Sequence, residues 1–162
     1  MLAASKLATV VDRMVVVVRA TDELSSSVFE HAGYVVVRCA QAHLGMAHSL
    51  ACGIAASRDS AAWMVALADM PLIAASTLTA LTTCWRHADR IVVPMCAGHA
   101  GHPVIFPARM VTQLLALDGD RGARAVLDAH RDEVFAFLTD DAGVLRDIDT
   151  PADLAATINS TP

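Results

Sequence analysis

The chain has 162 residues, of which 55% are hydrophobic and 18% are charged, and its formal net charge at pH 7 is −5. This length suits one domain with one core, and the composition excludes a disordered chain. Lysine occurs once, at Lys6, so there is no basic stripe for duplex nucleic acid, whereas a nucleotide can still bind through backbone N–H groups and a metal.

Short β-branched runs alternate with amphipathic or small-residue segments along the chain. Strands are predicted over residues 14–20, 34–38, 63–68, 90–94 and 134–138. Helices are predicted over residues 21–32, 45–57, 76–88, 109–117 and 121–132, and from Pro151 onward. The alternation predicts an α/β fold with βαβ units and a mostly parallel sheet between helices. Ligands of such sheets bind beyond the carboxyl ends of the strands.

Helix caps and apolar faces follow from the same segments. Leu24, Val28 and Ala32 share one face of the first of these helices. Ser76 is the expected N-cap of the helix over residues 76–88, which should bury Leu78, Leu81 and Trp85, and Thr150 is the expected cap of the last helix.

The cysteines and the apolar runs bear on the compartment. Cys39, Cys52, Cys84 and Cys96 form no CxxC pair, and their gaps suit neither a zinc site nor a small disulfide scaffold. We therefore expect reduced core cysteines in a cytoplasmic protein. No apolar run approaches the length that a bilayer requires, and "MVVVV" is too short for a signal-peptide core, so no membrane partner is expected.

Two acidic motifs are candidates for a metal site. In "LADMP" (67–71), Asp69 follows a predicted strand, where a carboxylate can hold Mg²⁺, although an aspartate before Pro71 can also simply close an Asx turn. In "LRDIDTPADL" (145–154), Asp147 and Asp149 lie on the same side of an extended segment. Either could supply a second carboxylate, or both could serve the start of the following helix.

A glycine-rich turn, "AGHAGHPVIF" (97–106), carries two histidines. Gly98 and Gly101 allow the backbone to approach a ligand closely. His99 and His102 could bind zinc, but no further ligand has a convincing spacing, and ordinary polar turn residues are the alternative.

Two further motifs precede predicted helices. In "LDGDRGAR" (117–124), Arg121 and Arg124 flank a helix start, which can form an anion site or a plain solvated cap. In "GMAHSLACG" (45–53), the amino end of a helix carries Gly45 and Ser49, which could meet a phosphate or a base, with His48 as a contact or a surface residue.

The order of "GMxxSLxxG", "LADMPL", "VPxxxGxxGHPVIF", "LxGDxGAR" and "DIDTPADL" resembles the MobA-like nucleotidyltransferase family, closest to its molybdenum cofactor cytidylyltransferase branch. The resemblance runs from about Val15 to Leu154. It implies a three-layer α/β/α Rossmann-like fold of the nucleotide-diphospho-sugar-transferase type, with residues 1–162 as a single domain shortened at its N-terminus.

The same resemblance implies an Mg²⁺-dependent enzyme. It would transfer a nucleoside monophosphate, with CTP or another NTP as donor, onto a molybdopterin-type cofactor and release pyrophosphate. The residues that it implies are Asp69 and Asp149 for the metal and catalysis; Lys6, Gly45, Ser49 and Asp69 for the nucleotide; and Gly101, His102, Arg121 and Arg124 for the side of the second substrate. A homo-oligomer or a molybdoenzyme partner stays open.

The start of the chain departs from the family pattern. The family opens with a strand and a loop of the form LAAGxSxRxGxxK, which wraps the triphosphate, whereas residues 2–7 read "LAASKL", with Lys6 where the family lysine stands. Without the central first strand we expect an unfilled slot or exposed edges in the sheet. A different start site, a deletion with lost activity, and completion by another chain all remain open. So do a cofactor- or nucleotide-binding relative without turnover and a purely structural oligomer.

Overall fold

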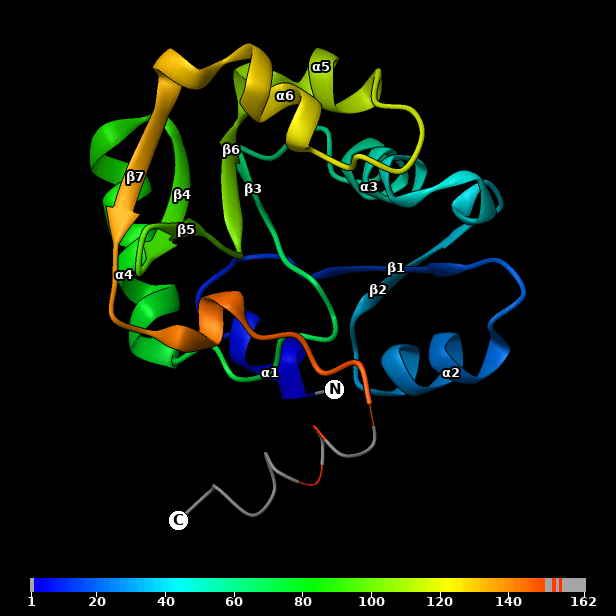
Figure 1. Cartoon of the computed structure of the whole chain (residues 1–162). Coiled ribbons are helices and arrows are strands. Elements are labelled where there is room, and N and C mark those ends of the chain that lie inside the picture. The colour runs from blue at the N-terminus through cyan, green and yellow to red at the C-terminus, as the bar shows by residue number, and fades with distance from the viewer. Residues whose placement is uncertain (1, 151–152, 154, 156–162) are drawn as a thin grey trace. The chain divides into compact units, whose positions relative to one another are not determined.

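The structure, a computed structural model, describes residues 2–150, 153 and 155 (Figure 1). The chain forms two compact units, each assembled from stretches that are distant in sequence. The first unit combines the described residues of Met1–Val11, Met64–Ile105 and Phe135–Pro162, and the second combines Asp12–Trp63 with Phe106–Val134. The single domain over residues 1–162 stays a prediction. Within the described residues, no helix has both the length and the hydrophobicity needed to cross a membrane.

The second unit contains a two-stranded parallel sheet. The elements of this unit are β1 (Val15–Arg19), α2 (Glu23–His31), β2 (Val35–Cys39), η1 (Ala42–Leu44), α3 (Met46–Ala55), η2 (Ala108–Met110), α5 (Val111–Leu115), α6 (Arg124–Ala129) and η3 (Arg131–Glu133), and the sheet consists of β1 and β2. In the sheet, Val15 lies opposite Val35 and Arg19 lies opposite Cys39. Both strands are rich in valine, whose branched side chain favours extended backbone.

Helix α3 packs on this sheet, as its small residues predict. It contacts β1, β2 and α5. A Cβ added at Gly53 would lie 3.0 Å from a methyl carbon of Val17 in β1, and Ala47 is completely buried. This close packing fixes the amino end of α3, where Ser49 lies.

The first unit is built around strand β4 and helix α4 (Figure 1). Its elements are α1 (Leu2–Leu7), α4 (Ala75–Ala88), β4 (Ile91–Cys96), β5 (His99–Ala100) and η4 (Ala142–Leu145). The chain passes between the units within β3 (Ala62–Val65), β6 (Val104–Pro107) and β7 (Val134–Leu138). Helix α4 contacts β4 and α1 and buries Leu78 and Leu81, as its spacing predicts, whereas Trp85, for which the same spacing predicts burial, is only half-buried.

The larger sheet has the order β3-β6-β4-β5, and β7 also pairs with β4. Strand β4 runs antiparallel to β6 and to β5, and Cys96 lies opposite His99 across the tight turn at Ala97 and Gly98. Only antiparallel strands can be joined by so short a turn. The α/β class is therefore confirmed, but a mostly parallel sheet is not, because the β1–β2 pair alone is parallel among these three pairs of the described chain.

The described strands form two sheets instead of one. The sequence predicts an unfilled slot or exposed edges in one sheet, and a division into two sheets is not among its predictions. Residues 2–7 form helix α1 here. Among the described residues, β1 pairs only with β2, and β3 is the end strand of its sheet. The expected open edges therefore occur at β1 and β3.

Two helix starts differ in their caps. Helix α4 begins at Ala75 and its N-cap is Ala74, so the prediction that Ser76 caps it is wrong. The N–H of Ala74 donates instead to Oδ2 of Asp141, at 2.9 Å, a partner that local sequence does not show. The last predicted helix lies mostly outside the described residues.

The cap of that last helix is nevertheless described. The N–H of Asp153 donates to Oγ1 of Thr150 at 3.2 Å, and the N–H of Thr150 donates to the Asp153 carboxylate at 2.9 Å. These reciprocal bonds form a capping box, so the predicted role of Thr150 is confirmed.

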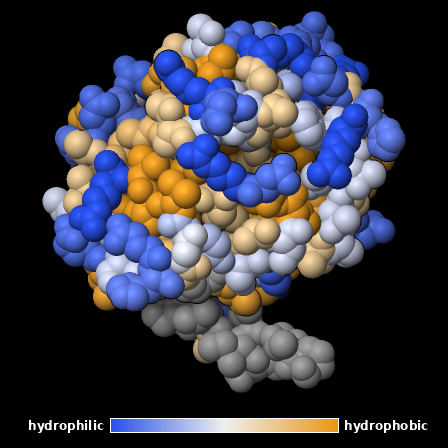
Figure 2. Space-filling model, turned by 180° about the vertical axis from the view of Figure 1, so that it is seen from behind, coloured by the Kyte–Doolittle hydropathy of each residue, from blue (hydrophilic) through white to orange (hydrophobic). Residues whose placement is uncertain are grey.

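Helix α2 turns apolar residues toward solvent. Leu24 is 78% exposed and Val28 is 43% exposed, whereas Ser26, half a turn away, is completely buried. The apolar spacing in this helix therefore does not mark its buried face. Figure 2 shows hydrophobic surface among hydrophilic side chains on the face seen from behind.

Cys39 and Cys52 form a disulfide bond, and their Cα atoms are 6.1 Å apart. The prediction of reduced cysteines is wrong for this pair, because sequence spacing does not show that the end of β2 meets α3. Cys84 and Cys96 are free thiols.

Candidate functional site

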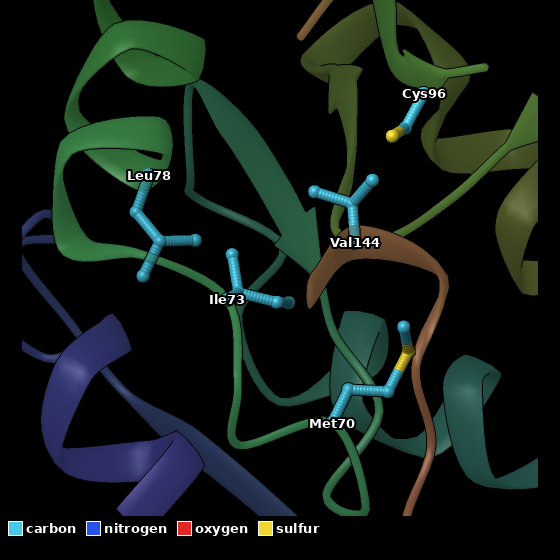
Figure 3. Close-up of a cluster of buried hydrophobic side chains, with 5 residues drawn as sticks. All are labelled: Met70, Ile73, Leu78, Cys96 and Val144. Carbon is cyan, nitrogen blue, oxygen red and sulfur yellow. The ribbon is translucent and has the colours of Figure 1, made fainter. Parts of the chain in front are cut away.

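Asp69 lies in an exposed turn that follows β3. The strand ends at Val65, earlier than predicted, so the carboxylate stands beyond the strand end and not on it. Its neighbours are anchored, since Met70 and Ile73 are each 4% exposed and pack with other buried side chains of the first unit. Figure 3 shows these side chains together with Leu78, Cys96 and Val144. The core therefore fixes the turn while the carboxylate stays in solvent.

The segment that carries Asp149 lies beside this turn. The backbone N–H of Ile148 donates to the carbonyl of Asp69 at 2.8 Å. Asp149 and Asp147 are both exposed. One hydrogen bond thus brings "LADMP" and "DIDTP" together, although they are far apart in sequence.

Two exposed carboxylates on adjoining segments fit a hard divalent cation. Mg²⁺ usually binds one or two protein carboxylates and keeps waters and substrate phosphate oxygens as its other ligands. No group of three or more histidine, cysteine or acidic side chains that could hold a metal occurs in the described part of the chain. The predicted metal role of Asp69 and Asp149 therefore stays a prediction.

Lys6 supports the same turn from helix α1. Its Nζ donates to the carbonyl of Pro71 at 2.8 Å and to that of Ile73 at 3.1 Å. Two of its three N–H donors are used in this way. Its predicted contact with the nucleotide stays a prediction, and the structure gives it a role in holding the turn.

Gly101 begins the segment that leads into β6. Its N–H donates to the carbonyl of Pro94 at 2.8 Å, and the next N–H, that of His102, donates to the carbonyl of Val144 at 2.9 Å. A Cβ at Gly101 would collide with the Val144 carbonyl. Glycine is therefore required here because the Val144 backbone comes close, and the predicted approach of a ligand to Gly101 stays a prediction.

The His102 ring lies near Asp69. Burial lowers the pKa of His102 below its ordinary value, while a hydrogen bond to the Val65 carbonyl and the Asp69 carboxylate partly oppose this shift. Its Nδ1 is buried and has no hydrogen-bond partner among the described residues. Burial therefore favours the uncharged imidazole, which lies next to the Val65 carbonyl and near the Asp69 carboxylate.

In the second unit, the amino end of α3 meets the loop "LDGDRGAR". Gly45 has φ +132°, and a Cβ there would collide with the Gly119 carbonyl and the Asp120 carboxylate. The N–H of Ala47 donates to that Gly119 carbonyl at 3.1 Å. Gly45 is thus required by both its conformation and its surroundings, and Ser49 follows one turn later on the helix.

His48 reinforces this contact. Its Nε2 lies 3.2 Å from Oδ1 of Asp118, and its side chain is only 16% exposed. The alternative of a plain surface residue is therefore excluded. No local signal in the sequence pairs these two residues.

Arg121 and Arg124 lie at the far end of the same loop. Arg121 binds the Asp128 carboxylate at 2.9 Å, and Arg131 binds it at 2.8 Å. The hydrogen bond from Arg131, followed by the charges of Arg131, Arg121 and Arg124, lowers the pKa of Asp128. Arg124 is exposed at the first residue of α6.

The predicted residues thus divide between the two units. The first unit holds Lys6, Asp69, Gly101, His102 and Asp149, and the second holds Gly45, Ser49, Arg121 and Arg124. Sequence analysis missed Asp141, whose carboxylate holds Ala74 and Gly143. It also missed Ile148 as the contact to Asp69. Both are tertiary contacts without a motif.

Comparison with known proteins extends this geometry. A model of the MobA-like NTP transferase domain matches residues 2–134. No protein among curated sequences matches significantly.

Several solved structures share the fold. Rv0371c from Mycobacterium tuberculosis H37Rv is 24% identical, with a TM-score of 0.77, over 98% of this chain and 83% of that chain. The same protein in complex with manganese is 23% identical, with a TM-score of 0.72, over 98% and 85%. A nucleotidyl transferase from Methanothermobacter thermautotroptrophicus, Mth528, is 18% identical, with a TM-score of 0.75, over 97% and 76%. A 4-diphosphocytidyl-2C-methyl-D-erythritol synthase is 17% identical, with a TM-score of 0.71, over 96% and 88%.

Proposed function

Because this chain belongs to the MobA-like NTP transferase domain family, whose members are nucleotidyltransferases, we propose that it transfers CMP from CTP to a molybdopterin-type cofactor. A phosphate oxygen of the cofactor forms a bond to the α-phosphorus of CTP. The bond from that phosphorus to the bridging oxygen breaks, and pyrophosphate leaves with the electron pair. The observation that supports this proposal most directly is the exposed Asp69 on an anchored turn, joined by Ile148 to the segment of Asp149.

Asp69 and Asp149 would hold Mg²⁺, which supplies neutralisation of the phosphate charges when it is bound. The relative Rv0371c has been solved in complex with manganese, which supports a divalent cation in this fold. The chain's own contribution is positional. Burial of Met70 and Ile73 and the two bonds from Lys6 keep the acid in one place.

The remaining predicted residues have separate roles in this proposal. Gly45 and Ser49 would contact the nucleotide at the amino end of α3, where the helix dipole favours anions. Gly101 and His102, together with Arg121 and Arg124, would face the second substrate. CTP is the proposed donor, and GTP and ATP are the competitors to test.

The direct test measures pyrophosphate release from CTP with Mg²⁺ and molybdopterin. We expect release by the wild-type chain and a loss of at least about a hundredfold in Asp69→Asn, because a ligand that neutralises the reacting phosphates is removed. Asp147→Asn and Asp149→Asn separate the two candidates for the second carboxylate. The control is Asp140→Asn, which changes an exposed acid of the same unit. Folded wild-type protein that releases no pyrophosphate would contradict the proposal.

A second candidate is a relative that binds the nucleotide or the cofactor without turnover. It is favoured by helix α1, which stands where the family has its triphosphate loop, and by the engagement of Lys6 with two carbonyls. Charge-assisted hydrogen bonds contribute about 1.5–3 kcal/mol each, so a site without that loop would bind a triphosphate weakly. Calorimetry with CTP and with molybdopterin would then show binding, while the pyrophosphate assay stays at background.

A further inference from the structure

The disulfide of the second unit lies next to the residues that are proposed to bind the nucleotide. Cys39 is the last residue of β2 and is 2% exposed. Cys52 lies in α3, three residues after Ser49. Their Cα atoms are 6.1 Å apart, inside the range that a disulfide spans without backbone movement. The bond therefore ties the end of a strand to the helix that carries the predicted nucleotide contacts.

The bond encloses a short segment of the chain. Residues 40–51 lie between the two cysteines and include η1, Gly45 and the first half of α3. The Sγ atom of Cys39 lies 3.6 Å from the carbonyl oxygen of His48, the residue before Ser49. A chemical change at the Cys39 sulfur therefore alters the surroundings of the α3 backbone next to Ser49, the predicted nucleotide contact.

Polar contacts hold the other side of the segment. Ala47 donates its N–H to the Gly119 carbonyl, and His48 lies against Asp118 in the same loop. These contacts join the segment to the loop over residues 117–123. The disulfide cross-links α3, at Cys52, to the end of β2. Reduction would remove that cross-link and leave only the packing and the polar contacts to hold the segment, which can then open more often.

We propose that Cys39 and Cys52 form a thiol–disulfide switch that regulates nucleotide binding at the amino end of α3. The proposal rests on the proposed function, because it concerns the same site. The oxidised form holds residues 40–51 in the arrangement that receives the nucleotide, and the reduced form must order them on binding.

The oxidant in this proposal is a low-molecular-weight disulfide. The thiolate of one cysteine attacks one of its sulfur atoms, forms a mixed disulfide and releases one thiol. The thiolate of the second cysteine then attacks the protein sulfur of that mixed disulfide and releases the second thiol. Two protein thiols are oxidised by two electrons, and the small disulfide is reduced to two thiols.

The two other cysteines serve as internal references. Cys96 is buried, and Cys84 is a partly buried free thiol whose pKa is raised by burial. A raised pKa leaves little thiolate, so Cys84 exchanges slowly. Cys84→Ser is therefore the matched control for Cys52→Ser.

The experiment uses the full chain, oxidised with glutathione disulfide or reduced with dithiothreitol. Hydrogen exchange of residues 40–51 and the Kd of Mg-CTP are measured in both states. In wild type and in Cys84→Ser, we expect faster hydrogen exchange after reduction and a Kd for Mg-CTP that is about three- to tenfold higher. The reason is that residues 40–51 are no longer held in the binding arrangement before the nucleotide arrives. Cys52→Ser should behave like the reduced wild type in both buffers.

The outcomes separate the switch from the proposed function. Equal Mg-CTP affinity in the two states, with the bond verified by mass after alkylation, overturns the switch and leaves the proposed function standing. Failure of the bond to form in the oxidised wild type also overturns the switch alone. Absence of Mg-CTP binding in both the oxidised and the reduced state overturns the proposed function, and the switch with it.

Discussion

At the scale of single residues, burial next to exposure decides what Asp69 can do. The side chain of Met70 is in the core, and the carbonyl of Asp69 itself accepts the N–H of Ile148. The carboxylate is the part of this residue that is left for a ligand. Replacement by asparagine should therefore change chemistry at this position and leave the turn intact.

His102 predicts a dependence of stability on pH. Burial places its folded-state pKa below the ordinary value of 6.5. As the pH falls below about 6.5, the unfolded chain takes up a proton that the folded chain resists, so stability is lost until the pH reaches the folded-state value. His102→Gln should flatten the melting temperature between about pH 7.5 and 5.5, measured with a chelator present. His87→Gln, which changes an exposed histidine of α4, should keep the wild-type slope.

Replacement of Gly45 by alanine should lower stability for two reasons, its backbone conformation and its close neighbours. Gly45→Ala forces an L residue into φ +132° and drives its Cβ into the Gly119 carbonyl. Gly33→Ala has the conformational part alone, because Gly33 has φ +82° and nothing lies within 4 Å of its added Cβ. We expect a loss of about 2–4 kcal/mol at Gly45 and about 1 kcal/mol at Gly33 in urea unfolding. Equal losses would show that the loop over residues 117–123 moves away freely.

At the scale of elements, helix α1 is joined to the turn of Asp69 by one side chain, that of Lys6. It is short, and helices of this length are not stable by themselves in water. Contact with α4 and the bonds from Lys6 to Pro71 and Ile73 hold it in place. The same bonds hold the turn of Asp69, so the start of the chain supports the candidate site indirectly.

Lys6→Met should therefore destabilise the first unit. It keeps the length of the side chain but removes two charge-assisted hydrogen bonds, at a cost of about 1–3 kcal/mol in the free energy of unfolding. Arg86→Met, which changes an exposed arginine of α4 in the same unit, is a control for the loss of one positive charge. If Lys6→Met keeps wild-type stability and weakens Mg-CTP binding alone, the predicted nucleotide role of Lys6 is the correct one.

At the scale of the whole molecule, binding and stability are linked. A ligand that binds only the folded chain adds about 2.7 kcal/mol of stability at a hundred times its Kd. Mg²⁺ and CTP together should thus raise the melting temperature, and the increase should vanish when a chelator removes the metal. Asp69→Asn should show no such increase, whereas Asp140→Asn should match wild type. An equal increase with CTP and chelator would show that the metal is not needed for binding.

The motifs and most elements could be predicted because they are local. The valine runs form β1 and β2, the spacing in α4 buries Leu78 and Leu81, and Thr150 forms the capping box with Asp153. The prediction of a mostly parallel sheet failed, because β4 turns directly into the antiparallel strand β5 instead of being followed by a crossover helix. The prediction of the buried face of α2 also failed, because Leu24 is exposed to solvent although it belongs to the apolar helical spacing.

The sequence by itself determined the family of this chain and the residue types that could meet phosphate and metal, because motifs are ordered along one chain. The tertiary structure decided which of these residues meet. Lys6 reaches Pro71, Ile148 reaches Asp69, and Cys39 reaches Cys52 only after folding. Such contacts depend on distances across the fold, and spacing along the chain does not encode them. It also decided that the described strands form two sheets, because β1 and β2 pair with each other while β3 pairs with β6.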